Sequence, residues 1–453
     1  MSATRKLIEF AAGTDYEKMP EEVIRMAKRC LLDCIGVTLA GSQHPLGAML
    51  QTYLDKFDRI PEATIFGTGR KSSQSSAALV NGALAHVLDF DDSSYSMGSH
   101  PTAPIMAALL SVGETNRSSG RQILEAFVLG FEAQCKLGAA MNPSFSERGW
   151  HPMGPLGRVG SVIAIGKLLG FEQDKMENAL ALACATASGI SSVAGTHAKA
   201  MNSGLAAEAG VRSALFADQG ITGPRAILER KGGFCDMFST KYNLPKLMRN
   251  LGEPYDLISP GVAFKQYPSC TATHAAIDAV LAIRQESGVG PDEIERIECK
   301  VGPWVPRFLV FPIPSNGLEG KFSMPYCLSV ALVNGAVSLH DFEDEAIKNA
   351  KVMDMMRRVS VIPDEELERE SYVEGAIVTL TDMSGRRHQR RVNKAKGNPE
   401  NPVSDVELRQ KFMACASACL RPEKIEKLAN LIMNLEKTQN VAELMNCVYK
   451  SGD

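Results

Sequence analysis

The chain has 453 residues, of which 45% are hydrophobic and 22% charged, enough to bury a large core in two or three domains. Its 49 basic and 52 acidic side chains nearly balance, which argues against nucleic-acid or membrane-surface binding as the main function. Segment 1–16 is charged and lacks the apolar run of a signal peptide, and the uncharged stretch 179–195 is too rich in Ala, Ser, Thr and Gly for a membrane span. We therefore expect a cytoplasmic protein that binds neither nucleic acid nor membrane.

Apolar residues at three- and four-residue spacing predict helices along most of the chain up to residue 258. These helices are expected at 6–12, 21–40, 74–88, 104–115, 120–141, 157–169, 173–188, 204–219 and 226–230. Alternating apolar and polar residues then predict strands at 294–301 and 374–381, the second leading through Arg386, Arg387 and His388 into a basic segment. Helical periodicity returns at 407–419 and 422–435.

This order of elements predicts a mainly α fold with a smaller α+β domain. We expect residues 1–258 and 397–453 to form a large all-helical domain, interrupted by an inserted α+β lid domain at 259–396. The Pro/Asn-rich linker 397–405 marks the return to the helical domain.

Cofactor and metal motifs are missing from the sequence. The eleven cysteines form no C-x-x-C pair, and the eight histidines show no H-x-x-x-H or H-E-x-x-H spacing, so neither an iron-sulfur cluster nor a zinc site is expected. Segment 154–160 (GPLGRVG) lacks the preceding strand of a nucleotide-binding loop. We predict a protein with no metal and no organic cofactor, whose cysteines are reduced and buried.

Segment 85–110 concentrates groups that can transfer protons. Asp89, Asp91 and Asp92 follow an apolar helical run, and a Ser/Gly-rich turn then leads to His100 and a second apolar run. Buried acids beside a histidine are costly to desolvate unless they are paired, which favours a functional site over simple packing. The alternative is a solvated turn that only caps helices.

Four further segments place reactive side chains at Gly/Pro breaks near helix starts. They contain His151 after Trp150, Lys199 among small residues, Lys265 with Tyr267, Cys270 and His274, and Lys321 with Tyr326. Each alone is compatible with an exposed or structural residue, but the recurrence of a cation or imidazole before a small-residue helix indicates a binding site. A helix N-terminus favours carboxylates and neutral imidazoles.

The order of these motifs resembles the MmgE/PrpD family. The matching segments are 88–92 (LDFDD), 99–101 (SHP), 149–151 (GWH), 154–157 (GPLG), 195–207 (GTHAKAMNSGLAA), 267–279 (YPSCTATHAAIDA) and 321–327 (KFSMPYC). The family includes 2-methylcitrate dehydratase, cis-aconitate decarboxylase and iminodisuccinate epimerase. The resemblance implies a helical domain with an α+β lid, a homodimer, and catalysis without metal or organic cofactor.

Position by position, the resemblance puts the active-site groups at a set of six residues. They are Asp89, Ser93, His100, His151, Lys199 and Lys265. Three departures count against decarboxylation: Ser93 stands where that branch has threonine, the segment from Asp89 to His100 is one residue longer, and 300–308 (KVGPWVPRF) offers no matching tyrosine.

The expected chemistry is removal of a proton next to a carboxylate, which builds up an enolate-like dianion and needs nearby cations and hydrogen-bond donors. We expect His100 and His151 to act as base and acid in either order, with Asp89 orienting His100. Lys199 and Lys265 would hold substrate carboxylates. Ser93, His274 and Tyr326 complete the predicted substrate-binding set.

The function that we expect is a lyase of small di- or tricarboxylates, with dehydration of a 2-methylcitrate-like acid favoured. Decarboxylation and epimerisation of a similar acid remain alternatives, because the same groups serve all three reactions. A non-catalytic carboxylate-binding protein is the alternative from another class.

Overall fold

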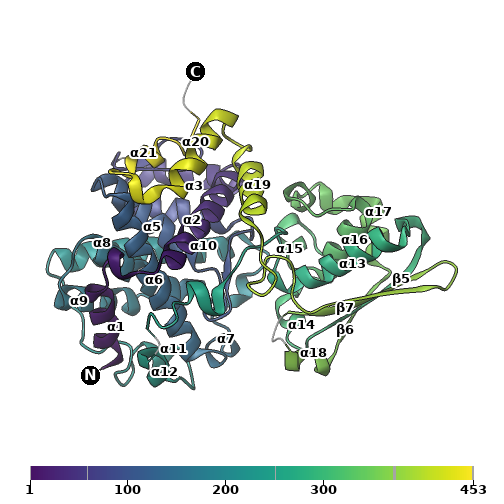
Figure 1. Ribbon diagram of the computed structural model, residues 1–453, viewed down its shortest axis with the longest axis horizontal. Coiled ribbons are helices and arrows are strands. Elements are labelled where there is room, and N and C mark those ends of the chain that lie inside the picture. Colours follow the sequence, from purple (N-terminus) through teal and green to yellow (C-terminus); the bar gives the residue numbers. More distant parts are fainter. Residues whose placement is uncertain (1, 59, 250, 371–373, 451–453) are drawn as a thin grey trace.

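The computed structural model describes residues 2–58, 60–249, 251–370 and 374–450. Figure 1 shows a large helical body that contains both chain ends and, beside it, a smaller body with one sheet. Helices predominate, and the main sheet lies in the C-terminal half, which confirms the predicted fold class. Within the described ranges, no helix is both long and apolar enough to cross a membrane.

The larger body is built mainly from helices. In chain order these are α1 (Ala3–Gly13), α2 (Glu21–Gly41), α3 (Pro45–Phe57), α4 (Gln74–His86), α5 (Thr102–Thr115), α6 (Gly120–Met141), α7 (Ser144–Glu147), α8 (Met153–Leu168), α9 (Gln173–Ala185), α10 (His197–Asp218), α11 (Phe234–Phe238), α12 (Leu244–Arg249), α19 (Asp405–Ala416), α20 (Pro422–Met433) and α21 (Ala442–Met445). Two short antiparallel pairs join them: β1 (Ala63–Thr64) with β2 (Lys71–Ser72), and β3 (Ser93–Ser94) with β4 (Val262–Ala263).

The smaller body packs helices on a four-stranded sheet. Its elements are α13 (His274–Ser287), β5 (Ile294–Val301), α14 (Val305–Phe308), α15 (Gly317–Gly320), α16 (Met324–Asn334), α17 (Ala350–Met356), β6 (Val359–Pro363), α18 (Glu365–Glu370), β7 (Ala376–Asp382) and β8 (Arg387–Val392). The strand order is β6-β5-β7-β8, with β5 parallel to β6 and the other pairs antiparallel. In β5, Ile294, Ile297, Cys299 and Val301 are buried, and they belong to the same apolar cluster as residues of α13 and α16.

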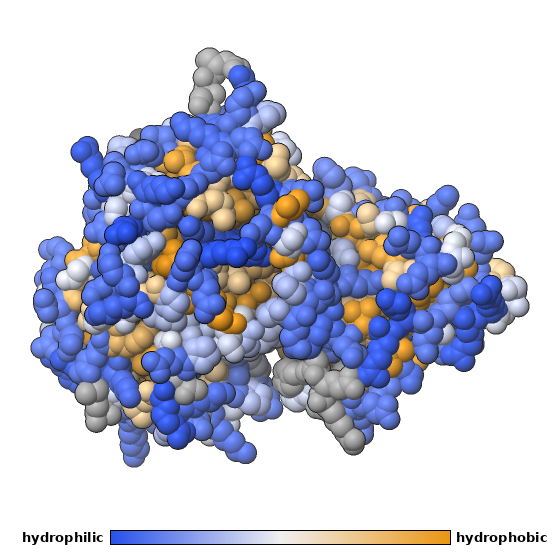
Figure 2. All heavy atoms as spheres, in the orientation of Figure 1, coloured by the Kyte–Doolittle hydropathy of each residue, from blue (hydrophilic) through white to orange (hydrophobic). Residues whose placement is uncertain are grey.

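Two large apolar clusters correspond to the two bodies. One contains residues between 3 and 264 and between 403 and 448, and the other contains residues between 272 and 395. Val262 and Phe264 belong to the first cluster, although the predicted boundary lies at 258/259. On the face drawn in Figure 2, hydrophilic residues cover most of the surface and apolar ones show between them. The exact domain boundaries remain a prediction.

Glycine contacts between α4 and α10 set the geometry around the predicted site. A Cβ on Gly82 would lie 2.9 Å from the Cα of Gly204, and one on Gly204 would overlap the carbonyl oxygen of Leu79. Only residues without a side chain allow the two backbones to approach so closely. This packing brings His86, at the end of α4, next to Lys199 in the first turn of α10.

Several element predictions need correction. Helix α10 begins at His197 and not at residue 204, so Lys199 lies inside the helix rather than before it. Segment 226–230 is a turn and not a helix, because Ala226 adopts a left-handed φ of 54° that a right-handed helix cannot contain. Helix α3 and strands β6 and β8 were not predicted, and β8 lies in the basic segment after the second predicted strand.

Candidate active site

The backbone around Asp89 is built to carry functional groups. After α4 ends at His86, the chain turns through Asp89, whose φ of 50° lies in the left-handed region. Such a conformation is rare for a residue with a side chain and persists only where the surroundings stabilise it. The chain then enters β3, where Ser93 pairs with Ala263 of β4, so Lys265 two residues further on lies close to Asp89.

Asp89 is the centre of the cluster, since two lysines hold the same carboxylate oxygen. Nζ of Lys199 lies 3.0 Å and Nζ of Lys265 lies 2.9 Å from its Oδ1, and Lys265 also donates to the Asp89 backbone carbonyl at 2.9 Å. All three side chains are nearly or fully buried. Burial alone would raise the pKa of Asp89, but Lys199 and Lys265 outweigh it and hold the pKa well below its usual range. The carboxylate is therefore ionised and paired.

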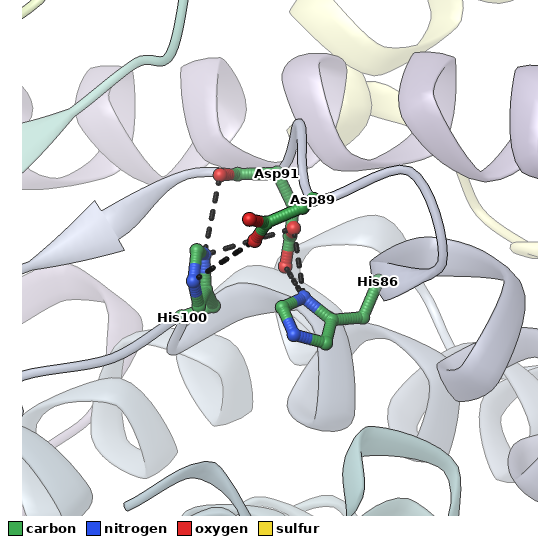
Figure 3. A group of neighbouring side chains, drawn as sticks. All are labelled: His86, Asp89, Asp91 and His100. Atoms are coloured by element: carbon green, nitrogen blue, oxygen red, sulfur yellow. Dashed lines mark hydrogen bonds and ion pairs between the residues drawn. The ribbon is translucent and has the colours of Figure 1, made fainter. Parts of the chain in front are cut away.

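Two histidines flank this carboxylate (Figure 3). Nδ1 of His86 lies 2.9 and 3.0 Å from the two carboxylate oxygens of Asp91, and Nε2 of His86 lies 2.6 Å from Nζ of Lys199. Nδ1 of His100 donates to the carbonyl oxygen of Asp92 at 2.9 Å, while its Nε2 lies 3.5 Å from Oδ1 of Asp89. The two ring centroids are 4.6 Å apart. Burial lowers the pKa of both imidazoles well below the usual value, so both rings are neutral near pH 7.

His151 approaches the same group from another direction. It lies two residues before α8, and its backbone N–H donates to the carbonyl of Gly189 at 3.1 Å. Its ring centroid is 6.1 Å from that of His86. Burial lowers the pKa of His151 well below its usual value, and its buried Nδ1 has no hydrogen-bond partner among the described residues. A neutral imidazole with an unused nitrogen is available for proton transfer.

A small hollow opens beside the cluster. Its lining residues are His86, Val87, Asp89, Gly195, Thr196, Lys199, Ala200, Leu318, Lys321 and Phe322. Lys321 donates from Nζ to the carbonyls of Leu88 at 2.9 Å and Pro268 at 3.0 Å, so it ties the smaller body to the turn before Asp89. Burial lowers its pKa to about 7.

The structure thus adds two lining residues, His86 and Lys321, to the predicted set. His86 lies in the same acid-rich segment as Asp89, and Lys321 opens the quoted 321–327 motif, so both signals were in the sequence. His86 was not among the predicted candidates, and Lys321 was named only as part of a candidate binding segment, because spacing along the chain does not show which side chains face the hollow.

Ser93, His274 and Tyr326, predicted to bind substrate, occupy different surroundings. The Ser93 hydroxyl is buried without a hydrogen-bond partner in the described part of the chain. His274 starts α13 and lines a second small hollow together with Lys265, and burial lowers its pKa to about 3. Tyr326 is fully buried, packs against Phe342, and donates its hydroxyl hydrogen bond to the carbonyl of Asp341. Its polar group is therefore used inside the smaller core, and its role in substrate binding stays a prediction.

The fold also groups potential metal ligands that sequence spacing did not reveal. Ligand atoms of His86, Asp89, Asp91 and His100 all lie within 4.8 Å of one another. The ammonium of Lys199, however, already contacts both His86 and Asp89, and Lys265 contacts Asp89 from the other side. Two ammonium groups at these distances repel a metal cation and attract an anion. The donor set therefore suits a carboxylate ligand better than a metal ion, and the absence of a metal stays a prediction.

Comparisons with known proteins extend over almost the whole chain. The MmgE/PrpD N-terminal domain matches residues 5–246, and the MmgE/PrpD C-terminal domain matches residues 267–437. The chain is 27% identical to a cis-aconitate decarboxylase from Mus musculus and 28% identical to one from Homo sapiens, over 98% of this chain and 92% and 94% of theirs. It is 24% identical to a 2-methylcitrate dehydratase from Salmonella typhimurium, over 77% of this chain and 75% of that protein. The two domain matches cover well over half of the sequence and agree with the resemblance found in its motifs, so the chain belongs to the MmgE/PrpD family.

Proposed function

We propose that the protein is a cofactor-independent lyase that removes a proton next to a carboxylate of a small di- or tricarboxylic acid. Dehydration of a 2-methylcitrate-like acid is the first candidate. The observation that carries the proposal is the Asp89 cluster, in which Lys199 and Lys265 are held beside the neutral imidazoles of His100 and His151. Cations next to neutral bases are what enolate formation requires.

Substrate binding follows from the charges at the hollow. Lys199 and Lys321 line it, and Lys265 contacts Asp89, so three lysines surround this carboxylate. Since burial lowers the pKa of Lys321 to about 7, this lysine carries its charge in only part of the molecules at neutral pH. Helix α10 begins two residues before Lys199, and its N-terminal N–H groups add to the positive potential. A ligand carboxylate placed in the hollow would compensate the remaining positive charge.

The proposed reaction begins when a neutral imidazole, His100 or His151, accepts the proton from the carbon next to a substrate carboxylate. The electron pair of the broken C–H bond enters an enolate-like dianion, which the lysine ammonium groups stabilise. In a dehydration the electron pair of the enolate then forms a carbon–carbon double bond while the adjacent C–O bond breaks. The leaving hydroxyl takes up a proton from a lysine ammonium, or from the imidazolium formed in the first step, and departs as water.

Decarboxylation is the second candidate, because the cis-aconitate decarboxylases match 98% of this chain and the dehydratase only 77%. Against it stand the sequence departures at Ser93, in the segment before His100, and at 300–308. Epimerisation, as in the family's iminodisuccinate branch, would begin with the same proton removal, and a proton would then be added to the opposite face of the same carbon. The choice among these reactions is an outcome of the test.

The test is incubation with 2-methylcitrate, citrate, cis-aconitate and iminodisuccinate in deuterated water, followed by NMR. Loss of water, release of CO₂ or inversion identifies the reaction, and deuterium at the carbon next to a carboxylate identifies proton removal. Binding without deuterium incorporation or product would indicate a carboxylate-binding protein and contradict the proposal.

We further propose that the enzyme acts as a homodimer in the cytoplasm and without a metal ion. The family resemblance supports the dimer, and the ammonium groups against the ligand-like cluster support metal-independent catalysis. Sedimentation velocity tests the dimer, and assays after metal removal test the absence of a metal.

A further inference from the structure

His86 is the most deeply placed histidine of the cluster and has no role in the reaction described so far. Its side chain is completely buried, as is that of Asp91. Both ring nitrogens are engaged, Nδ1 with the Asp91 carboxylate at 2.9 and 3.0 Å and Nε2 with Nζ of Lys199 at 2.6 Å. The ring therefore connects a buried acid to a lysine that lines the hollow.

The partners determine which nitrogen carries the proton. An ammonium group has only donors, so Nε2 of His86 must accept a hydrogen bond from Lys199. A neutral imidazole with a lone pair on Nε2 carries its hydrogen on Nδ1, and this N–H donates to Asp91. Burial, with Lys199 next in effect, lowers the pKa of His86 and keeps the ring neutral.

Lys199 gains a defined orientation from this contact. Its three N–H donors are divided among His86 Nε2 at 2.6 Å, Asp89 Oδ1 at 3.0 Å and one remaining direction. The Lys199 side chain is 12% exposed and lines the hollow together with Phe322, whose ring centroid is 5.3 Å from Nζ. With two donors engaged in the protein, the third is left for a ligand.

We propose that His86 is a positioning residue: Asp91 fixes its Nδ1–H form, and its Nε2 lone pair aims Lys199 at the substrate carboxylate. In this arrangement Asp91, His86 and Lys199 form a hydrogen-bonded chain that ends at the ligand. A lysine on a flexible stem would otherwise sample several rotamers, and holding it in place lowers the cost of binding. The substrate part of this inference rests on the proposed function, whereas the protonation state of His86 does not.

The first test needs no substrate. In protein with ¹⁵N-labelled histidine rings, the His86 signals are those lost in the His86→Gln variant, and they should show a protonated Nδ1 and an unprotonated Nε2 at pH 7. The His340→Gln variant is the matched control, because the His340 side chain is 88% exposed and should only remove its own signals. An Nε2–H ring or an imidazolium at His86 would overturn the inference.

The second test asks whether His86 acts through Lys199. His86→Leu should lower kcat/KM by about 10- to 100-fold, as expected for loss of a charge-assisted hydrogen bond, mainly through a higher KM. In a Lys199→Met background the same substitution should change kcat/KM by no more than about threefold, because the residue it positions is gone. The kcat/KM of His86→Gln, which keeps a hydrogen-bond acceptor, should lie between those of the wild type and His86→Leu. If His86→Leu does not fold, His86→Gln takes its place in the comparison of the two backgrounds.

An equal loss in both backgrounds would indicate a merely structural histidine and refute the positioning role. The two hypotheses can fail separately. An Nδ1–H ring in a protein that is inactive on every acid would leave the protonation assignment intact and contradict only the proposed function. An Nε2–H ring in an active enzyme would contradict the protonation assignment and leave the proposed function intact.

Discussion

Replacement of Lys265 by Met removes the most buried cation of the cluster. Its side chain is 1% exposed, and it donates at 2.9 Å both to Oδ1 and to the backbone carbonyl of Asp89. The carboxylate would keep Lys199 but lose half of its charge compensation, in a turn that already holds a left-handed φ of 50°. Removal of one partner of a buried ion pair costs about 3–5 kcal/mol, since the other charge stays buried.

This free energy converts into a measurable melting shift. An unfolding entropy of about 2.1 cal/mol/K per residue gives about 1 kcal/mol/K for 453 residues, so Lys265→Met should lower Tm by about 3–5 °C in scanning calorimetry. Adding Asp89→Asn to Lys265→Met should recover part of the loss, because a neutral amide needs no cation. The control is Lys300→Met, since Lys300 is half exposed and its ion pair with Asp364 lies at the surface.

Two results would refute this reasoning. A Tm of Lys265→Met within 1 °C of the wild type, as expected for Lys300→Met, would mean that the Lys265–Asp89 pair contributes no stability. Alternatively, the double variant could melt no higher than Lys265→Met alone, which would mean that the unpaired charge of Asp89 is not the cause of the loss.

Four further predictions concern activity and pH. His100→Gln and His151→Gln should each lower kcat by about 10²-fold or more with an unchanged circular dichroism spectrum, and near-wild-type turnover in both would assign the proton transfer elsewhere. Lys199→Met should weaken diacid binding by about 1.5–3 kcal/mol, seen as a higher KM; an unchanged KM and kcat would make Lys199 irrelevant to the substrate. Activity should survive prolonged EDTA treatment, and loss that added metal restores would contradict the metal-free mechanism. Burial raises the pKa of Asp92 from 3.8 to about 8. Between these two pH values the native state keeps the carboxyl proton of Asp92 and the unfolded chain loses it, so the free energy of unfolding falls as the pH rises from about 4 to 8. The difference in urea midpoint between Asp92→Asn and the wild type should therefore move in favour of the variant from pH 5 to pH 8. The same difference at both pH values would exclude Asp92 as the titrating group.

Local patterns in the sequence were sufficient for much of the fold. The predicted ranges for α2, α6 and β5 agree with the structure to within a residue, because apolar residues recur at helical spacing in α2 and α6 and alternate with polar ones in β5. The start of α10 was missed for a related reason. Its first turns carry His197, Lys199, Asn202 and Ser203, polar residues that interrupt the apolar pattern on which the prediction depended.

The sequence also located the acid-rich segment and the separate histidines and lysines, since charged groups next to apolar helices need partners wherever they are buried. The sequence did not show which residues pair with each other. His86 and Lys199 are 113 positions apart, and they meet because Gly82 and Gly204 let α4 and α10 pack closely. Lys265 and Asp89 are 176 positions apart, and they meet because β3 pairs with β4. Such contacts depend on how whole elements pack in space, which periodicity along the chain does not record, so the tertiary structure alone decided which of the candidate groups share a carboxylate.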